Sequence, residues 1–253
     1  MQLPQMSEKL EATPKIPTGI SGLDKMLDGG FNRGRVILVL GEPGTGKTIF
    51  CAQYLHCGAM VQNQRTMFIG MNEPQTRFMA EMKELGMDFK KLESDGLFRY
   101  IDATEVRRIP EQAKVGRISV GGRELGLVNL LETTQDAIAK FSPQRIAVDS
   151  ISDLIFRFPS IEERRPVVLD IVDTLQSTSA TSLITSELLS TGGERILQPE
   201  EYLAEGVILL RTLLKGMRTV QILKMRGSKV DTHPRPYVIE ADGIKIYSKE
   251  EVY

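Results

Sequence analysis

The stretch Gly41–Thr48, which reads GEPGTGKT, decides the fold that this sequence predicts. It matches G-x-x-x-x-G-K-[ST] at every fixed position, and this pattern is typical of a loop that holds phosphate groups. The apolar run Val36–Leu40 precedes it, and Lys47–Val61 follows with the composition of a helix. Glycines let successive backbone N–H groups surround a phosphate, and the start of a helix adds the positive end of its dipole. The stretch therefore predicts a strand, a phosphate-binding loop and a helix, in that order.

Two side chains of this loop have distinct expected roles toward a bound nucleotide. Lys47 is expected to reach the β- and γ-phosphates, as a binding and a catalytic residue, and Thr48 is expected to offer its hydroxyl to Mg²⁺. The residues expected to contact the nucleotide along the loop are Glu42, Pro43, Gly44, Thr45, Gly46, Lys47, Thr48 and Ile49.

A second metal-binding residue is expected at the end of another strand. The run Arg145–Asp149 is apolar or aliphatic up to its last residue, which is an acid. An acid in this position holds Mg²⁺ through the water shell of the ion in many phosphate-loop proteins. Asp149 is therefore predicted to complete the metal site with Thr48.

Apolar runs and helical segments alternate along the first three quarters of the chain. Because several runs are continuous rather than alternating, they predict strands that are covered on both faces, as in a parallel sheet. Near the C-terminus, short strands follow one another through turns, with no helix-length gap, and should pair antiparallel. The sequence thus predicts an α/β core with a mainly parallel sheet and a C-terminal antiparallel extension. The predicted strands are Val36–Leu40, Thr66–Met71, Phe98–Asp102, Arg145–Asp149, Ser182–Thr185, Gly206–Thr212, Thr219–Met225, Tyr237–Glu240 and Ile244–Tyr247, and the predicted helices are Lys47–Val61, Pro74–Leu85, Leu127–Lys140 and Glu163–Thr178. Residues 105–126 are predicted to form a long loop or insertion.

Length and composition bound what the chain does. It has 253 residues, a net charge of -1 and 26% charged residues, as expected of a globular protein rather than a membrane or fibrous one. We expect a flexible arm over residues 1–15 and one domain over 16–253. The N-terminus lacks the pattern of a secretory signal, and Cys51 and Cys57 lie six apart, too far around a helix to bond. Free thiols predict a cytoplasmic protein, and the lack of an apolar run of about 18 residues predicts no membrane partner.

Four separated motifs resemble the KaiC-like ATPases of the RecA superfamily. They are Thr18–Asp24 with Asp28-Gly29-Gly30 ahead of the loop, the segment Phe68–Asp88, the segment Arg145–Phe158, and Lys224–Gly227. The resemblance covers Ile16–Tyr247, and it implies a RecA-like fold, Mg-ATP as ligand and a hexameric ring with ATP at each subunit boundary. In the family, the Lys and Arg of K-x-R-G reach the γ-phosphate in the neighbouring subunit. Here these are Lys224 and Arg226, which we expect to be catalytic in trans. A Glu at the position of Glu187 implies contact with the γ-phosphate or its water.

The chain departs from the family after the second strand. Many KaiC-like domains carry two adjacent Glu there, of which the first is the usual candidate to activate water, but this chain reads Asn72-Glu73. An Asn side chain can orient water but cannot accept its proton. Glu73 can act as the base only if the strand has already turned, since neighbouring residues on a strand face opposite ways. We predict that Glu73 polarises the water and that turnover is slow; the alternative is that Glu73 only caps the helix after it.

The sequence also bears on three other functions, which are DNA binding, autophosphorylation and an ATP-gated scaffold. RecA-like loops at Phe156–Pro166 and Leu189–Tyr202 hold four basic and five acidic side chains, which disfavours binding of single-stranded DNA. The segment Glu105–Glu124 holds five basic and three acidic ones, so nucleic acid remains an alternative partner, as in DNA repair. The cyanobacterial clock protein, a KaiC-like ATPase, phosphorylates an adjacent Ser-Thr pair. The matching stretch here, Glu201–Glu205, has no Ser or Thr, so autophosphorylation is not expected there, although Ser190 and Thr191 lie upstream. An ATP-gated scaffold is the third possibility, and a regulatory role with an unknown protein partner is preferred.

Overall fold

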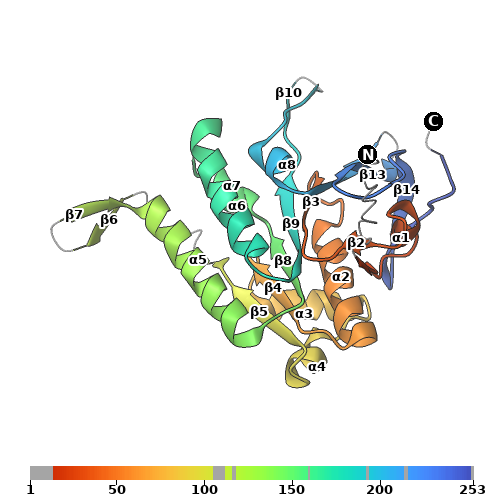
Figure 1. Ribbon diagram of the computed structural model, residues 1–253, viewed down its shortest axis with the longest axis horizontal. Helices are drawn as coiled ribbons and strands as arrows, with labels where there is room; N and C mark the ends of the chain where they lie inside the picture. The colour runs from red at the N-terminus through yellow and green to blue at the C-terminus, as the bar shows by residue number, and fades with distance from the viewer. Residues whose placement is uncertain are drawn as a thin grey trace, which may run out of the picture.

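A nine-stranded, mostly parallel sheet forms the centre of the molecule (Figure 1). The computed structural model describes residues 14–104, 112–115, 118–158, 160–191, 194–213 and 216–251. From one edge to the other, the strands are β15 (Gly243–Ile246), β14 (Arg235–Glu240), β13 (Arg218–Met225), β12 (Gly206–Thr212), β3 (Val36–Gly41), β9 (Thr181–Glu187), β8 (Arg145–Asp149), β4 (Thr66–Gly70) and β5 (Phe98–Asp102). The strands from β12 to β5 are parallel, and β12 to β15 pair antiparallel. The predicted α/β fold with a C-terminal antiparallel extension is thereby confirmed.

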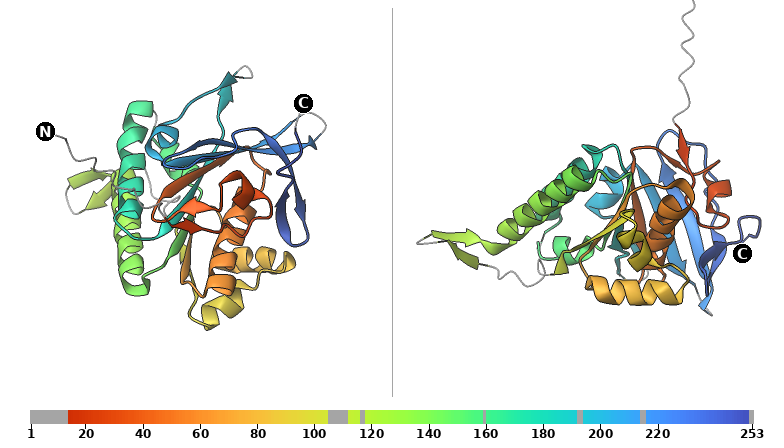
Figure 2. Two further views of the ribbon diagram at one scale, coloured as in Figure 1. Left: turned by 45° about the vertical axis from the view of Figure 1, so that its right-hand side comes forward. Right: turned by 90° about the horizontal axis from the view of Figure 1, so that it is seen from below.

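Helices cover both faces of this sheet, as the two views of Figure 2 show. One hydrophobic core lies under α1 (Leu23–Met26), α2 (Lys47–Gln62), α3 (Gln75–Glu84) and α4 (Phe89–Ser94). The other lies under α5 (Gly122–Phe141), α6 (Ser152–Ile155) and α7 (Ile161–Gln176). In β3, Ile37 and Val39 belong to the first core, whereas Val36, Leu38 and Leu40 belong to the second. Burial on both faces is why this strand reads as a continuous apolar run.

The predicted positions of the main helices and strands are confirmed to within a few residues, except before α5. Residues 105–126 were expected to form a loop, but Gln112–Val115 (β6) and Ile118–Gly121 (β7) pair as an antiparallel hairpin, and α5 already begins at Gly122. The hairpin extends away from the body of the molecule (Figure 2) and pairs with no strand of the central sheet. Each strand of the hairpin has only four residues, and alternation of polar and apolar residues over so short a run is a weak signal for a strand.

Smaller elements complete the described chain. They are β1 (Lys15–Ile16) paired with β2 (Phe31–Asn32), β10 (Ser190–Thr191) paired with β11 (Glu194–Arg195), and the short helix α8 (Pro199–Leu203). Cys51 is buried, Cys57 is half-buried and both are free, as predicted. Among the residues that the structure describes, no helix has both the length and the apolarity to cross a lipid bilayer.

The buried side chain of Arg145 joins helix α2 to strand β8. Its guanidinium is fully buried and donates hydrogen bonds to the carbonyl of Tyr54 at 2.7 Å, to Gln64 Oε1 at 2.7 Å and to Gln62 Oε1 at 2.9 Å. Gly58 makes room for it, because a Cβ on this residue would lie 2.5 Å from Arg145 Cδ. The opposite ends of α2 and β8 carry Lys47 and Asp149, so this cluster fixes the two elements that position them.

Replacing Arg145 with Met should lower the free energy of unfolding by about 2–4 kcal/mol, because the buried carbonyl of Tyr54 and the half-buried side chains of Gln62 and Gln64 lose a charged donor. Urea unfolding followed by circular dichroism measures the change. The matched control is Arg33→Met, an exposed cation on a turn, whose effect should stay within about 0.5 kcal/mol. Equal effects of the two substitutions would contradict a structural role for Arg145.

Candidate functional site

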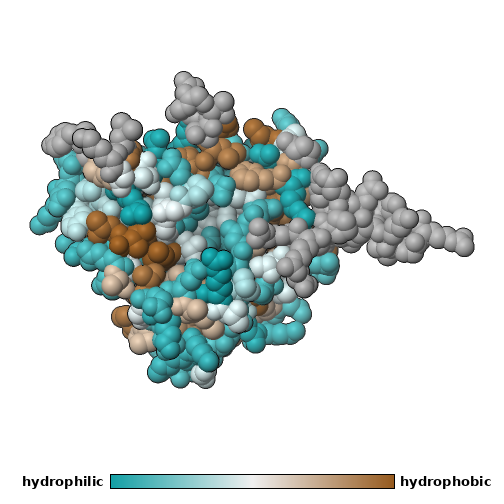
Figure 3. Space-filling model, turned by 180° about the vertical axis from the view of Figure 1, so that it is seen from behind, coloured by the Kyte–Doolittle hydropathy of each residue, from teal (hydrophilic) through white to brown (hydrophobic). Residues whose placement is uncertain are grey.

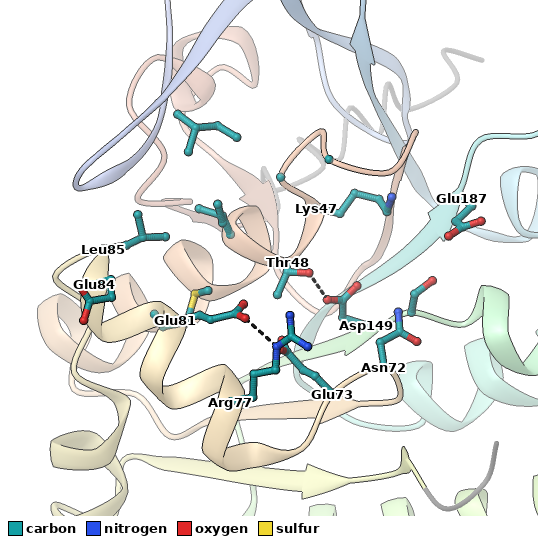
Figure 4. A pocket seen from close by; sticks show the side chains of 16 residues that line it. Lys47, Thr48, Asn72, Glu73, Arg77, Glu81, Glu84, Leu85, Asp149 and Glu187 are labelled. Atoms are coloured by element: carbon teal, nitrogen blue, oxygen red, sulfur yellow. Dashed lines mark hydrogen bonds and ion pairs between the residues drawn. The ribbon is translucent and has the colours of Figure 1, made fainter. Parts of the chain in front are cut away.

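The carboxyl ends of four parallel strands meet at one edge of the sheet, and a cleft of about 660 Å³ opens above them. The register makes these ends level: Gly41 of β3 lies opposite Glu187 of β9, and Gly70 of β4 lies opposite Asp149 of β8. Ligands of open α/β sheets bind at this edge. Figure 4 shows the side chains that converge on the cleft from α2, α3, β8 and β9.

The phosphate-binding loop has the conformation that its glycines permit. Gly44 and Gly46 both adopt left-handed φ angles, of 78° and 89°. A Cβ on Gly46 would also lie 2.8 Å from Ile239 Cδ1, so the backbone could not approach β14 so closely with a larger residue. Gly46 is the N-cap of α2, and the first turn of this helix contains no acidic residue. The positive end of the helix dipole therefore faces the cleft, with no acidic residue of the helix's own first turn beside it.

Lys47 supplies the positive charge at the base of the cleft. Its Nζ donates hydrogen bonds to the carbonyl oxygens of Gly41 at 2.8 Å and Glu42 at 3.1 Å. Burial lowers the pKa of Lys47, and the negative charges of Asp149 and Glu187 act in the opposite direction. The lysine thus lies between the loop backbone and two carboxylates, in a position to exchange its carbonyl partners for phosphate oxygens.

Thr48 and Asp149 form the pair of oxygen ligands expected for Mg²⁺. Thr48 Oγ1 donates to Asp149 Oδ2 at 2.5 Å, and Thr185 Oγ1 donates to Asp149 Oδ1. A hydroxyl and a carboxylate side by side are hard oxygen donors, which Mg²⁺ prefers when it also keeps waters and substrate phosphates. In the described part of the chain, no group of three or more His, Cys, Asp and Glu side chains could hold a metal by itself. The donor set therefore fits a metal that arrives with its phosphate ligand.

Strand β4 has turned before it reaches Asn72 and Glu73. It ends at Gly70, and the next residue, Met71, donates its N–H to the carbonyl of Asp149 at 2.8 Å. The hydroxyl of Tyr100 donates to the carbonyl of Glu73 at 2.7 Å, which fixes the bend from the other side. Both Asn72 and Glu73 consequently line the cleft, although they are neighbours in sequence. The N-cap of α3 is Pro74, which makes no side-chain hydrogen bond, and Glu73 lies one residue before it, so the capping alternative for Glu73 stays a prediction beside its role as a base.

The carboxylate of Glu73 has the pKa of a group that exchanges protons near neutrality. Burial, together with the negative charges of Glu81 and Asp149, raises the pKa of Glu73 to about 7, while Arg77 opposes the shift. The side chain of Glu73 is 15% exposed, and its Oε2 lies 3.7 Å from Arg77 Nε. Arg77 also contacts Glu81 at 2.7 Å, one helical turn further along α3. A pKa near the working pH is what a general base requires.

The structure brings most of the predicted site residues to this cleft. The predicted residues that line it are Gly44, Gly46, Lys47, Thr48, Ile49, Asn72, Glu73, Asp149 and Glu187. Glu42, Pro43 and Thr45 are not among its lining residues: Glu42 Oε2 accepts from the N–H of Thr212, and Thr45 is buried beneath the loop.

Lys224 and Arg226 do not lie at the cleft of their own chain. Lys224 Nζ donates to the carbonyls of Glu201 at 2.9 Å and Tyr202 at 3.4 Å on α8, and Arg226 is exposed just beyond β13. Burial and the nearby charge of Arg226 lower the pKa of Lys224. The two cations therefore lie close together on a surface away from the phosphate-binding loop.

Sequence reasoning missed two groups of cleft residues. The charged group is Arg77, Glu81 and Glu84 on α3; the spacing of four residues from Glu73 through Arg77 to Glu81 would have indicated one helical face. The apolar group is Met82, Leu85 and Ile239, which come from the end of α3 and from β14. No local motif joins these apolar residues, because only the packing of β14 beside α2 brings them together.

Comparison with known proteins places this geometry in a family. The family model described as "ATPase: KaiC" matches residues 16–251. The chain belongs to the KaiC family of ATPases. A UPF0273 protein of Aeropyrum pernix is 34% identical over 246 residues, which cover 94% of this chain and 95% of the relative. The circadian clock oscillator protein KaiC of Synechococcus elongatus is 30% identical over 98% of this chain, which spans only 47% of the clock protein.

A solved structure of a KaiC-like protein has the same fold. The crystal structure of the KaiC-like protein from the hyperthermophilic archaeon Pyrococcus horikoshii superposes with a TM-score of 0.78 at 27% sequence identity. The match covers 93% of this chain and 99% of the archaeal one. The RecA-like, KaiC-type fold expected from the sequence motifs is thus confirmed.

Replacing Lys47 with Met should separate ligand binding from stability. Removal of a charge-assisted contact to phosphate should weaken ATP binding by about 30-fold or more. The free energy of unfolding without nucleotide should not fall, because burial already disfavours the charged lysine. Titration calorimetry with Mg-ATP and urea unfolding measure the two quantities, and unchanged ATP affinity would remove Lys47 from the site.

Proposed function

We propose that this KaiC-family chain binds Mg-ATP in the cleft and hydrolyses it slowly to ADP and phosphate. The observation that carries the proposal is the convergence of Lys47, the Thr48–Asp149 pair and the Glu73 carboxylate on one cleft. In the reaction, a water oxygen bonds to the γ-phosphorus while the bond to the β,γ-bridging oxygen breaks. The proton of the water passes to Glu73 and from there to solvent.

The loop and the metal pair would hold the triphosphate. The N-terminus of α2 and Lys47 would bind the β- and γ-phosphates, and Thr48 and Asp149 would hold Mg²⁺ directly or through its waters. The metal would neutralise charge on the phosphate oxygens. Glu187, level with Gly41 at the sheet edge, would contact the γ-phosphate side of the site through water.

The apolar side of the cleft would hold the adenine ring. Ile49, Leu85 and Ile239 are partly buried and pack against the core while lining the cleft. Sites for flat cofactors and nucleotide bases combine such apolar walls with a few polar groups. These residues come from α2, α3 and β14, so the adenine would contact both the N-terminal third of the chain and the C-terminal antiparallel strands.

Glu73 explains both why hydrolysis occurs and why it is slow. Its pKa of about 7 leaves Glu73 able to accept a proton near neutral pH, while Arg77 at 3.7 Å stabilises the charged carboxylate and thereby weakens it as a base. Asn72, which lines the same cleft, would orient the water by hydrogen bonding without accepting a proton. Phosphoryl transfer depends chiefly on positioning and charge, so a weak base permits slow turnover.

The kcat/KM for ATP should rise as the pH increases through about 7, because Glu73 of the nucleotide-free enzyme must be deprotonated to accept a proton. In Glu73→Gln this limb of the pH profile should vanish and turnover should fall about 100-fold, while the affinity for ATP stays within about twofold. Glu84→Gln, which removes another carboxylate that lines the cleft, is the matched control. A pH limb that persists in Glu73→Gln would assign the base to another residue.

We infer that the active form is a ring of identical subunits, with six as the expected number. Lys224 and Arg226 lie away from the cleft of their own chain, as residues that serve a neighbour must. Lys224 donates hydrogen bonds to carbonyls of the segment 196–202, and this segment carries exposed apolar side chains. They are Ile196, Leu197 and Tyr202. Figure 3 shows hydrophobic patches breaking the otherwise hydrophilic surface of the face opposite to Figure 1. Such patches favour contact with a second copy of the chain.

Mixed rings test whether the site is shared between subunits. Glu73→Gln and the double variant Lys224→Ala/Arg226→Ala should each be inactive alone. Rings co-assembled from equal amounts should regain about one quarter of wild-type turnover, because one boundary in four then combines an intact Glu73 with intact cations. Steady-state ATPase assays measure this. No recovery in rings shown to contain both subunits would place the two cations outside the neighbour's site.

A regulatory or signalling role in the cytoplasm with a protein partner is the cellular function that we propose, in line with the clock function for which the Synechococcus elongatus relative is named. The DNA-binding alternative depended on the basic residues of segment 105–124, of which Arg107, Arg108 and Arg117 lie outside the residues that the structure describes. ATP turnover measured with and without single-stranded DNA distinguishes the two roles, since a DNA-dependent ATPase is stimulated by the strand and a regulatory one is indifferent to it.

A further inference from the structure

The C-terminal hairpin β14–β15 packs directly against the phosphate-binding loop and the first turns of α2. Ile239 and Ile244 fill the space left by the missing side chain of Gly46, at 2.8 and 3.5 Å from the place of a Cβ. Gln53 on α2 exchanges two hydrogen bonds with the backbone of Ile244, at 2.6 and 3.3 Å. The hairpin is thus attached to the loop and to the helix that follows it.

Tyr237 of β14 makes the polar contact between this hairpin and the loop. Its hydroxyl donates a hydrogen bond of 2.6 Å to the carbonyl oxygen of Thr45. Tyr237 is 3% exposed and Thr45 is fully buried, so water does not compete for this bond. Burial raises the pKa of the Tyr237 hydroxyl, which therefore stays protonated and able to donate.

We propose that Tyr237 is a positioning residue that orients the Thr45–Gly46 peptide for the β-phosphate of the nucleotide. A peptide unit is planar, and in the trans form its C=O and N–H point in opposite directions. Because Tyr237 holds the Thr45 carbonyl toward β14, the N–H of Gly46 points to the other side of the peptide plane. That N–H is then available to a phosphate oxygen at the N-terminus of α2. This inference rests on the proposed ATP site.

The hydrogen bond from Tyr237 is needed because glycine makes the Thr45–Gly46 peptide easy to rotate. Gly46 adopts a φ of 89°, and a residue without a Cβ has several other accessible conformations. A rotated peptide would turn the Thr45 carbonyl oxygen toward the phosphate, where two negative oxygens repel each other. The buried hydroxyl opposes this rotation, since the carbonyl would lose its hydrogen-bond partner in a dry environment.

Tyr237→Phe tests the proposal, because it removes the hydroxyl and keeps the ring. The chain offers a matched control: Tyr54→Phe removes another fully buried hydroxyl, which donates to the carbonyl of Thr181 at 3.0 Å, away from the cleft. Each full-length variant is titrated with Mg-ADP and with a non-hydrolysable Mg-ATP analogue. Thermal unfolding without nucleotide is measured in parallel, and titrations are made well below both midpoints.

Tyr237→Phe should weaken both nucleotides by about 3- to 10-fold, since both contain the β-phosphate and one buried hydrogen bond is lost. Tyr54→Phe should leave both affinities unchanged while lowering the unfolding midpoint to a similar extent. Wild-type affinity in Tyr237→Phe, or equal weakening in both variants, would overturn the positioning role. If the wild-type chain binds neither nucleotide, the proposed function fails together with this inference.

Discussion

The level register of the four central parallel strands is the constraint on which the site depends. The phosphate-binding loop begins at the carboxyl end of β3, and Asp149 and Glu187 are the last residues of β8 and β9. Glu73 follows the carboxyl end of β4. A slip of one strand by one residue would turn its side chains to the opposite face and would move its end along the sheet. Continuous apolar burial on both faces holds this register, and Arg145 secures it from the far end by joining β8 to α2.

The sequence was sufficient to predict those features of the fold and the site whose residues lie close together in the chain. The loop Gly41–Thr48, Asp149 and the apolar strands were predictable because each combines a local motif with a local burial pattern. The turn at Asn72 and Glu73 could only be stated as a condition, since the contacts that make it come from Asp149 and Tyr100 on neighbouring strands. The apolar wall was missed because its residues come from separate segments, whereas the hairpin β6–β7 was missed although its strands alternate, because each strand has only four residues.

The carboxylates at the cleft outnumber the cations that face them. Lys47 faces Asp149 and Glu187, while Glu73 shares Arg77 with Glu81. This arrangement keeps carboxylates close to the place where a triphosphate would bring more negative charge. A metal ion and cations from outside the chain would relieve that repulsion, which contributes, after burial, to the raised pKa of Glu73.

The hydrogen bonds of Lys47 to Gly41 and Glu42 have a consequence for selectivity among anions. A ligand gains only the difference between its own contacts and those that the lysine already has within the loop. Inorganic phosphate or sulfate offers one small group and little else to repay that exchange. A nucleoside triphosphate adds further phosphate oxygens and a base for the apolar wall. The loop would thereby discriminate against the free phosphate of the cell without any residue that clashes with it.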